Sequence, residues 1–535
     1  MAESAGPAPS SSSRAADKLR SMRRSLALVV ALLCSSCVHA DKTRSPATHA
    51  PIDVIELELA EAQRRMQTGV LSSAALTAAY LERIAAIDDA GPALTAVVEI
   101  SPLALTEAEA LDQERAQGRV RGPLHGIPVL IKDNIDVAGM VNSAGSLALA
   151  EHRPRVDAPL VSRLRAAGAV ILGKTNLSEW ANFRSSDSTS GWSSRGGQTK
   201  NPYALDRNPC GSSSGTGAAI AASLAAVGVG TETDGSILCP SAIQGLVGLK
   251  PTVGLIPGAG IIPISATQDT AGPMARTVRD AALLLNGMTE GTGDYAAGLD
   301  VAALQGKRIG VLRQAMGADP RLDAITEQAL ASLRAAGAVL IDPVEIATWQ
   351  QWGEHEFEVL LYEFKDGIDR YLRESGAPVS SLAGLIAWNR EHARAVMPWF
   401  GQDVLEQAQA KDGLDAPAYA AARAAARRLA WDEGLGATLT THRLDAVVAP
   451  AMGPAWPTDP VLGDRIGGGS FGVAAVAGTP SLTVPMGDIH GLPVGLAFLG
   501  KPRGEAELLA MGYAFEQKAR ARRAPTFRPT VTLAE

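Results

Sequence analysis

The sequence predicts an α/β protein, in which strands and helices alternate along one chain. Three observations support this fold class. Apolar runs rich in β-branched residues, within 124–135 and at 169–172, have the length and composition of buried strands. Apolar residues at three- and four-residue spacing within 54–88 predict amphipathic helices. A strand, helix and strand follow one another at 307–341, which is the alternation expected of α/β architecture.

Composition and charge limit the class of function. Of 535 residues, 46% are hydrophobic and 20% charged, as in an ordinary soluble globular enzyme. The net charge of −7 and the aromatic content of 4% argue against a nucleic-acid partner, which usually requires a basic face and stacking side chains. His442 and His490 have no matched ligand partners, so we expect no metal site and no cofactor.

The N-terminal residues resemble an export signal. Basic residues at Arg23 and Arg24 precede a short apolar run at 26–33, followed by small residues. The run is too short to span a bilayer as a helix. Two processing sites remain open: cleavage after Ala40, or lipidation of Cys37 as in a lipoprotein.

These features predict three segments: an N-terminal extension and secretory signal at 1–40, a linker at 41–53, and a single large domain at 54–530. No linker-like segment is visible after residue 50, and one α/β unit can bury most of such a chain's apolar surface. We therefore expect an exported protein, periplasmic or lipid-anchored at the cell envelope.

The elements of the large domain follow from periodicity and breakers. Gly69 separates the first two helices, and Ser72 and Ser73 can cap the second. Residues 263–276 are expected to form a loop that leads into a helix. Further helices are expected at 103–117, 277–285, 325–336 and through most of 349–428, and strands at 96–100, 124–135, 169–172, 307–312, 338–341, 444–450, 481–486 and 492–499.

The stretch from residue 208 to 252 carries the chemistry. Two loops of small residues, 210–216 and 232–236, flank an Ala-rich run with the character of a buried helix and strand. Glycine and serine let a backbone turn sharply and present N–H groups to a ligand, so the loop serines are candidate nucleophiles. A serine needs a base to take its proton. Lys132 ends an apolar run, where burial would lower its pKa and leave it neutral.

These stretches together resemble the amidase signature family. The motifs are G-I-P-V-L-I-K-D-N, C-G-S-S-S-G and T-E-T-D-G-S-I, and further matches extend the resemblance from about residue 54 to about residue 520. The resemblance implies a single-domain fold with a large mixed central sheet covered by helices on both faces. The motifs E-W-A-N-F-R, T-E-T-D-G-S-I and P-I-S-x-x-Q-D-T-x-G-P-M-A-R make it most similar to the bacterial peptide amidases.

The resemblance also implies a Ser–Ser–Lys triad. Lys132 would be the base, Ser212 the bridging serine that follows a cis peptide bond, and Ser236 the nucleophile that becomes acylated. An oxyanion hole would be formed by the backbone N–H groups of four consecutive residues, Thr233, Asp234, Gly235 and Ser236. The other nearby hydroxyls are expected to satisfy loop backbone groups: Ser213, Ser214, Thr231 and Thr233.

The implied function is hydrolysis of a carboxamide to a carboxylate and ammonia through an acyl-enzyme, with the C-terminal amide of peptides as substrate. The alternatives are an amidase of small aliphatic or aryl amides, a glutamine-using amidotransferase subunit, and an idle binding protein on the same scaffold. Leu238 stands where many family members have Arg, and Asp234 where many have Gly, which counts against the amidotransferase. The presence of all three triad residues counts against the idle protein. We expect a monomer or homodimer.

Two other motifs compete with this interpretation. Residues 168–175 satisfy G-x-x-x-x-G-K-T, but the four middle residues are typical of a strand rather than a phosphate-binding loop. Ser213 sits in G-x-S-x-G, but no apolar strand precedes it, as a nucleophile elbow requires. Cys210 and Cys239 are either buried packing residues or, in an exported protein, a disulfide. The loop at 185–197 is either packed surface or a wall of the substrate site.

Overall fold

A computed structural model describes residues 52–291, 293–465 and 467–532, and residues 52–535 form one compact unit. The predicted extension and signal, with Cys37 and Ala40, and nearly all of the linker lie outside the described residues.

The described strands form one mixed sheet of 11 strands, in the order β1-β3-β2-β6-β8-β7-β12-β13-β11-β9-β10, and a separate two-stranded hairpin of β4 and β5. The sheet strands are β1 (Val97–Ile100), β2 (Pro128–Lys132), β3 (Val170–Thr175), β6 (Val227–Glu232), β7 (Val247–Lys250), β8 (Thr270–Ala275), β9 (Arg308–Leu312), β10 (Val339–Val344), β11 (Ala446–Pro450), β12 (Ser481–Ile489) and β13 (Leu492–Leu499). The hairpin strands are β4 (Trp192–Ser193) and β5 (Gly197–Gln198).

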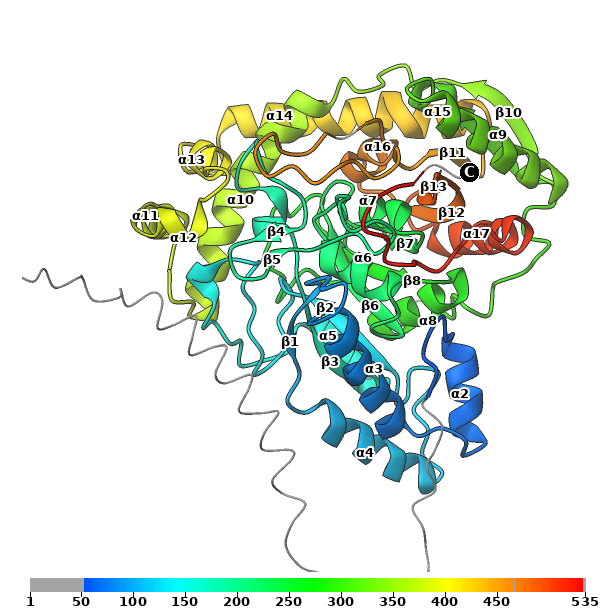
Figure 1. Ribbon diagram of the computed structural model, residues 1–535. Helices are drawn as coiled ribbons and strands as arrows, with labels where there is room; N and C mark the ends of the chain where they lie inside the picture. Colours follow the sequence, from blue (N-terminus) through cyan, green and yellow to red (C-terminus); the bar gives the residue numbers. More distant parts are fainter. Residues whose placement is uncertain (1–51, 292, 466, 533–535) are drawn as a thin grey trace, which may run out of the picture. The chain divides into compact units, whose positions relative to one another are not determined.

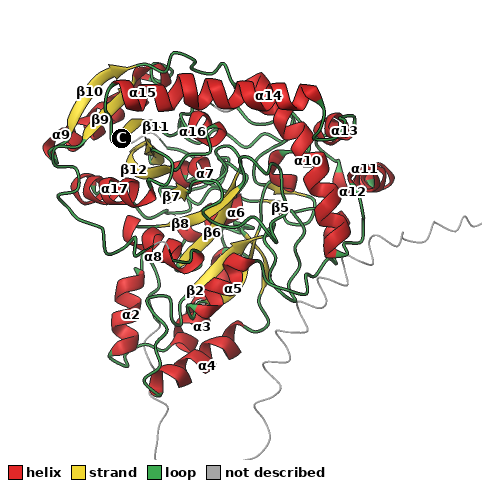
Figure 2. Cartoon of the chain, turned by 180° about the vertical axis from the view of Figure 1, so that it is seen from behind, coloured by secondary structure: helices red, strands yellow, loops and turns green. Residues whose placement is uncertain are grey.

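Helices surround the sheet (Figures 1 and 2). They are α2 (Leu59–Gln67), α3 (Ser73–Ile87), α4 (Ala104–Ala116), α5 (Pro159–Ala166), α6 (Ser214–Ala221), α7 (Leu238–Ile243), α8 (Val278–Met288), α9 (Pro320–Ala335), α10 (Gly353–Ser375), α11 (Leu382–Glu391), α12 (Ala393–Val396), α13 (Asp403–Gln409), α14 (Pro417–Arg427), α15 (Gly436–Thr441), α16 (Gly472–Val476) and α17 (Glu505–Ala519). Short 3₁₀ turns lie at η1 (Leu147–Leu149), η2 (Glu179–Asn182) and η3 (Arg313–Ala315), and a π-helical turn at η4 (Arg428–Leu435).

The sheet carries a hydrophobic core on each face. Along β13, Leu496 and Phe498 belong to a cluster shared with α8, α9 and α17. The alternate residues Ala497 and Leu499 belong to a second cluster, shared with α7, α15 and α16. Successive side chains of a strand point to opposite faces, so helices cover both sides of the sheet. The predicted α/β fold with a large mixed sheet is thereby confirmed.

The strand register brings the candidate residues together. β2 and β6 are adjacent and parallel, with Ile131 opposite Val229. The carboxyl ends of parallel strands meet at one edge of a sheet, which is where ligands commonly bind in α/β folds. Lys132 at the end of β2 therefore lies beside Thr231 near the end of β6, and the loop at 233–236 follows directly.

Most predicted elements are present, with two differences. The first helix begins at Leu59 rather than at residue 54. The predicted loop at 263–276 was wrong in part, because β8 occupies Thr270–Ala275 in the middle of the sheet. Gly272 and Pro273 obscure this strand in the sequence, since both disfavour strands. Tight packing accounts for the glycine: a Cβ at Gly272 would lie 2.1 Å from the carbonyl oxygen of Leu249.

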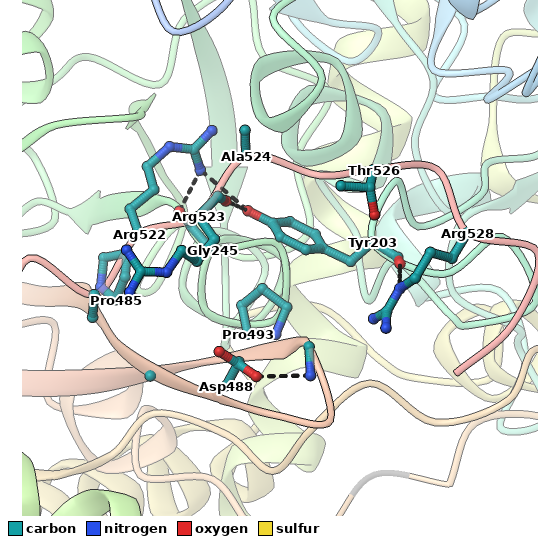
Figure 3. A pocket seen from close by; sticks show the side chains of 13 residues that line it. Tyr203, Gly245, Pro485, Asp488, Pro493, Arg522, Arg523, Ala524, Thr526 and Arg528 are labelled. Atoms are coloured by element: carbon teal, nitrogen blue, oxygen red, sulfur yellow. Dashed lines mark hydrogen bonds between the residues drawn. The ribbon is translucent and has the colours of Figure 1, made fainter. Parts of the chain in front are cut away.

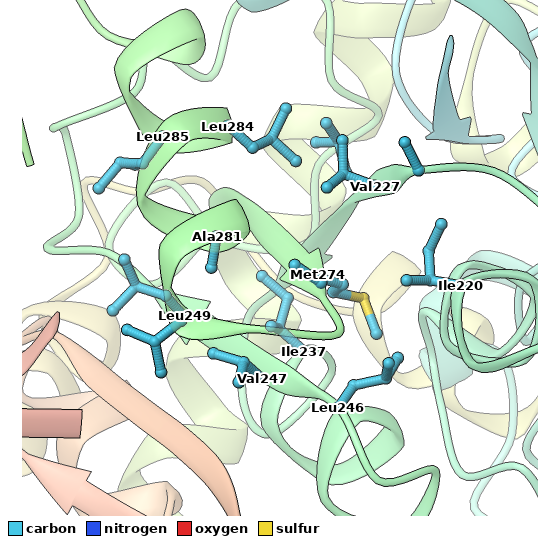
Figure 4. Packing of buried hydrophobic residues seen from close by; sticks show 14 of the residues in the cluster. Ile220, Val227, Ile237, Leu246, Val247, Leu249, Met274, Ala281, Leu284 and Leu285 are labelled. Atoms are coloured by element: carbon cyan, nitrogen blue, oxygen red, sulfur yellow. The ribbon is translucent and has the colours of Figure 1, made fainter. Parts of the chain in front are cut away.

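The core under the 233–236 loop is closely packed. Figure 4 shows side chains from β7, β8 and α8, among them Leu249, Met274 and Leu284, gathered around Ile237. All four side chains are fully buried. Ile237 directly follows Ser236, so this cluster anchors the loop from below.

We expect Leu249→Ala to lower the free energy of unfolding by about 3 kcal/mol, because it deletes buried methyl groups and leaves a cavity. The matched control is Leu103→Ala, whose side chain is 55% exposed, and there we expect a change within about 0.5 kcal/mol. Urea denaturation followed by circular dichroism measures both. Equal losses in the two variants would contradict the packing described.

Candidate active site

Lys132 is fully buried and makes three short contacts at the end of β2. Its Nζ lies 2.8 Å from Ser212 Oγ, 2.8 Å from Thr231 Oγ1 and 3.2 Å from the Thr231 carbonyl oxygen. Asn134 Nδ2 also donates to Thr231 Oγ1, at 3.0 Å, which fixes the threonine hydroxyl. The lysine is thus held between Ser212 and Thr231.

Burial favours the neutral form of this lysine. It lowers the pKa of Lys132 to about 7, while the charges of Asp269 and Glu232 act in the opposite direction and only partly offset the effect. None of the described carboxylates forms an ion pair with Lys132. A substantial fraction of the side chain is therefore neutral near pH 7.

Ser212 is fully buried and follows a cis peptide bond from Gly211. No side chain fits at Gly211, because a Cβ there would lie 2.1 Å from Ser178 Oγ. The chain then enters α6 after Ser213. The cis bond that the family resemblance implied is present.

Ser236 is 8% exposed and lines a cavity of about 470 Å³. Its carbonyl oxygen accepts a hydrogen bond from the Ser213 N–H at 3.2 Å, which ties the two serine loops together. Among the hydrogen bonds of the described residues, none joins the hydroxyls of Ser212 and Ser236 directly. The structure therefore brings Lys132, Ser212 and Ser236 into one region, with only Ser236 at the cavity.

The loop that carries Ser236 is held by carboxylates. Glu232 Oε2 accepts the N–H groups of Ile237 and Leu238, at 2.7 and 2.9 Å. Thr233 Oγ1 donates to Asp269 Oδ1 at 2.6 Å. These bonds fix both ends of the loop.

The backbone of the loop leaves several N–H groups available. Gly235 has a positive φ of +75°, and a Cβ on it would lie 2.4 Å from the Phe471 ring. Its N–H lies against the Glu232 carboxylate. Within the described part of the chain, the N–H groups of the other three predicted oxyanion-hole residues donate to no protein acceptor: Thr233, Asp234 and Ser236.

The cavity has aromatic, polar and acidic parts. Trp349 and Trp352 pack edge to face, with ring centroids 5.6 Å apart, and form an apolar wall with Phe471 and Met452. Asp234 is the acid that lines the cavity. None of the described lining residues is a lysine, arginine or histidine.

A strained segment borders the cavity opposite the sheet edge. Trp180, Ala181 and Asn182 have positive φ values of 52°, 54° and 68°, an unusual run for non-glycine residues. Asn182 Nδ2 donates to Ser190 Oγ at 2.9 Å, and both residues line the cavity. Ser190 belongs to the loop at 185–197, so that loop supplies part of the wall.

Cys210 and Cys239 form a disulfide, with Cα atoms 6.0 Å apart. This decides between the two alternatives that the sequence left open. The bridge joins the segments before Ser212 and after Ser236, and both cysteines line the cavity.

Several nearby residues have structural roles. Ser213 Oγ bonds to the backbone of Thr231, which excludes it as an exposed nucleophile elbow. Thr231 and Thr233 do not act as predicted, because their hydroxyls contact Lys132 and Asp269 instead of loop backbone. The run at 168–175 contains β3, and Lys174 Nζ donates to the carbonyls of Ile135 and Val141, which excludes a phosphate-binding loop.

Sequence reasoning missed four contributors to the site: Gln268, Asp269, Glu356 and Phe471. Gln268 Nε2 donates to the Thr233 carbonyl at 3.3 Å and to Glu356 Oε1 at 2.8 Å. The motif that contains Q-D-T was a signal for Gln268 and Asp269. No local pattern marks Glu356 or Phe471, which reach the site from distant elements.

A second cavity, of about 230 Å³, lies around Tyr203 and the C-terminal arginines (Figure 3). Its guanidinium groups are already engaged: Arg522 with Glu56 and the Gly245 carbonyl, and Arg528 with the Tyr203 carbonyl. It shares no lining residue with the cavity of Ser236.

Neither a bilayer-spanning helix nor a metal cluster is found among the described residues. No described helix has the length and apolarity needed to cross a bilayer. No group of three or more His, Cys, Asp or Glu side chains in that part of the chain is arranged to hold a metal ion.

Known proteins resemble this chain over most of its length. The Amidase family profile matches residues 75–509. The solved peptide amidase of Stenotrophomonas maltophilia is 55% identical with a TM-score of 0.85, and the match covers 88% of this chain and 99% of that one. A probable amidase of Arabidopsis thaliana is 38% identical over 85% of this chain and 89% of its own length. One component of the glutamyl-tRNA(Gln) amidotransferase of Pseudomonas syringae pv. syringae is 33% identical, over 86% and 97%. The chain belongs to the amidase signature family and is an amide-hydrolysing enzyme with close similarity to peptide amidases.

Proposed function

We propose that this amidase hydrolyses the C-terminal carboxamide of peptides, releasing ammonia, with Ser236 as nucleophile, Ser212 as proton relay and Lys132 as base. The observation that carries the proposal is the contact between buried Lys132 and Ser212, beneath the cavity in which Ser236 is exposed. Such a lysine can be neutral near pH 7, as a base must be.

The contacts of Lys132 suit a proton acceptor. The two oxygens of Thr231 take two N–H donors of the amine, and the remaining direction faces Ser212. Ser212 passes its proton to Lys132 and takes one from Ser236 as Ser236 Oγ attacks the amide carbon. The relay then returns a proton to the leaving ammonia, and water hydrolyses the acyl-enzyme.

The free N–H groups beside Ser236 suit the developing oxyanion. Thr233, Asp234 and Ser236 have backbone donors without protein acceptors, and donors fixed in advance stabilise a tetrahedral intermediate. Gly235 supplies the turn that aims them, and its position under the Phe471 ring keeps water away.

The cavity favours an amidated peptide over glutamine. The proposal draws on the 55% identity to a peptide amidase, and on walls of Trp349, Trp352 and Phe471 that suit a peptide side chain. The identity of 33% to an amidotransferase component keeps glutamine as the second candidate. Glutamine carries an α-carboxylate, and no cationic side chain among the described residues lines the cavity to bind it.

We expect the purified protein to release ammonia from an amidated peptide faster than from glutamine or a small aryl amide. Ser236→Ala and Lys132→Ala should each lower kcat by at least about a thousandfold, because they remove the nucleophile and its base. Lys518→Ala, an exposed lysine on α17, serves as the control. Activity retained by Ser236→Ala would show that another group is acylated, and activity confined to small amides would discard the peptide substrate.

The pH dependence of kcat/KM should follow Lys132. Its pKa is lowered to about 7, and only the neutral amine accepts a proton. Below pH 7 we therefore expect kcat/KM to fall about tenfold per pH unit, and above it to level off. Initial rates between about pH 5 and 9 measure this, with thermal melts at each pH to exclude unfolding. A profile that still rises near pH 10 would mean that the lysine is not desolvated in solution.

We also propose that the protein is exported, periplasmic or lipid-anchored. The disulfide between Cys210 and Cys239 supports this, because disulfides persist in oxidising compartments. Cell fractionation followed by N-terminal mass spectrometry should find a processed chain in the periplasm or envelope, starting after Ala40 or at a lipidated Cys37. An unprocessed chain in the cytoplasm would refute export.

A further inference from the structure

Two acidic side chains meet beside the nucleophile. Asp234 lies two residues before Ser236 and lines the same cavity. Glu356, in the first turn of α10, is 8% exposed and hydrogen-bonds to the carboxyl group of Asp234. Gln268 Nε2 donates to Glu356 Oε1 and also to the Thr233 carbonyl. The pair is therefore built into the loop that carries the nucleophile.

The proposed chemistry leaves this pair unused. In the described part of the chain no donor reaches Asp234 Oδ1, although that atom is buried. The other charged groups that act on Asp234 are Glu232 and Lys250, which are buried and attract each other. With no cation on its described lining, the cavity presents an acid to whatever enters.

The pair holds a proton in common. Burial and the neighbouring Glu356 raise the pKa of Asp234 well above its usual value, and burial raises that of Glu356 to about 7. Two interacting carboxyl groups lose their protons in separate steps. At about pH 8.5 the pair accordingly keeps one proton and one negative charge.

We propose that Asp234 and Glu356 together determine specificity, admitting carboxamides that carry no carboxylate near the scissile bond and repelling the carboxylate product. The proposal rests on the proposed function, since it takes the reacting carbon to lie at Ser236. A primary amide and the matching acid have nearly the same shape, so charge is the property by which a site can tell them apart. Repulsion of one unit charge across a partly solvated pocket corresponds to about tenfold in affinity.

The test measures binding without turnover, in a Ser236→Ala parent. Isothermal calorimetry at about pH 8.5 gives the dissociation constants of N-acetyl-L-phenylalaninamide and N-acetyl-L-phenylalanine. The parent should prefer the amide. In Asp234→Asn/Glu356→Gln the ratio of the two constants should fall about tenfold, mainly through tighter binding of the acid. Each single substitution should have a smaller effect, because the remaining carboxyl group ionises alone.

The matched control is Glu354→Gln/Glu391→Gln, which removes two exposed acids from α10 and α11 and should leave the ratio within about twofold. A ratio that changes less than about threefold in the double variant, or amide and acid that weaken together, would overturn the proposal. In enzymes that keep Ser236, inhibition by the acid product gives a second measurement with any carboxamide that the wild type hydrolyses. A wild type that does not hydrolyse peptide amides would overturn the substrate assignment alone.

Discussion

The burial of one lysine at the end of a parallel strand is the constraint on which the site depends. Lys132 emerges from an apolar strand between two neighbours, and all the hydrogen bonds described for its amine go to neutral oxygens of Ser212 and Thr231. A charged ammonium in that place lacks the solvation it has in water, so the neutral form is favoured. An acidic partner would restore the usual pKa, and its absence from the described contacts gives the lysine its chemistry.

Acids are instead placed around the nucleophile loop, at positions where they shape backbone. Glu232 collects N–H groups at the start of α7, and Asp269 holds the Thr233 hydroxyl. Each carboxylate removes donors on the outer side of the loop, which leaves the N–H groups on the inner side free for a ligand. The same arrangement keeps negative charge out of direct contact with Lys132, and it places the Asp234–Glu356 pair at the cavity wall.

Close packing by glycine makes this geometry possible. Gly211 sits against Ser178, Gly235 under Phe471, and Gly272 against the backbone of β7. At each position a Cβ would lie within 2.4 Å of another atom, so the strands and loops could not approach as they do. The high glycine and alanine content of the central stretch thus reflects the distances between elements more than local flexibility.

The sequence by itself determined the elements and the three central residues, because apolar periodicity and short motifs are local properties. The helices at α2 and α3, the strand of Lys132 and the two serine loops follow from such patterns. Only the tertiary structure decided what depends on contact between distant segments: the strand β8 with its glycine and proline, the pairing of Cys210 with Cys239, and the approach of Glu356 and Phe471 to the nucleophile loop. The physical reason is that burial, desolvation and hydrogen bonding are properties of the folded neighbourhood, and no local pattern records which residues will share it.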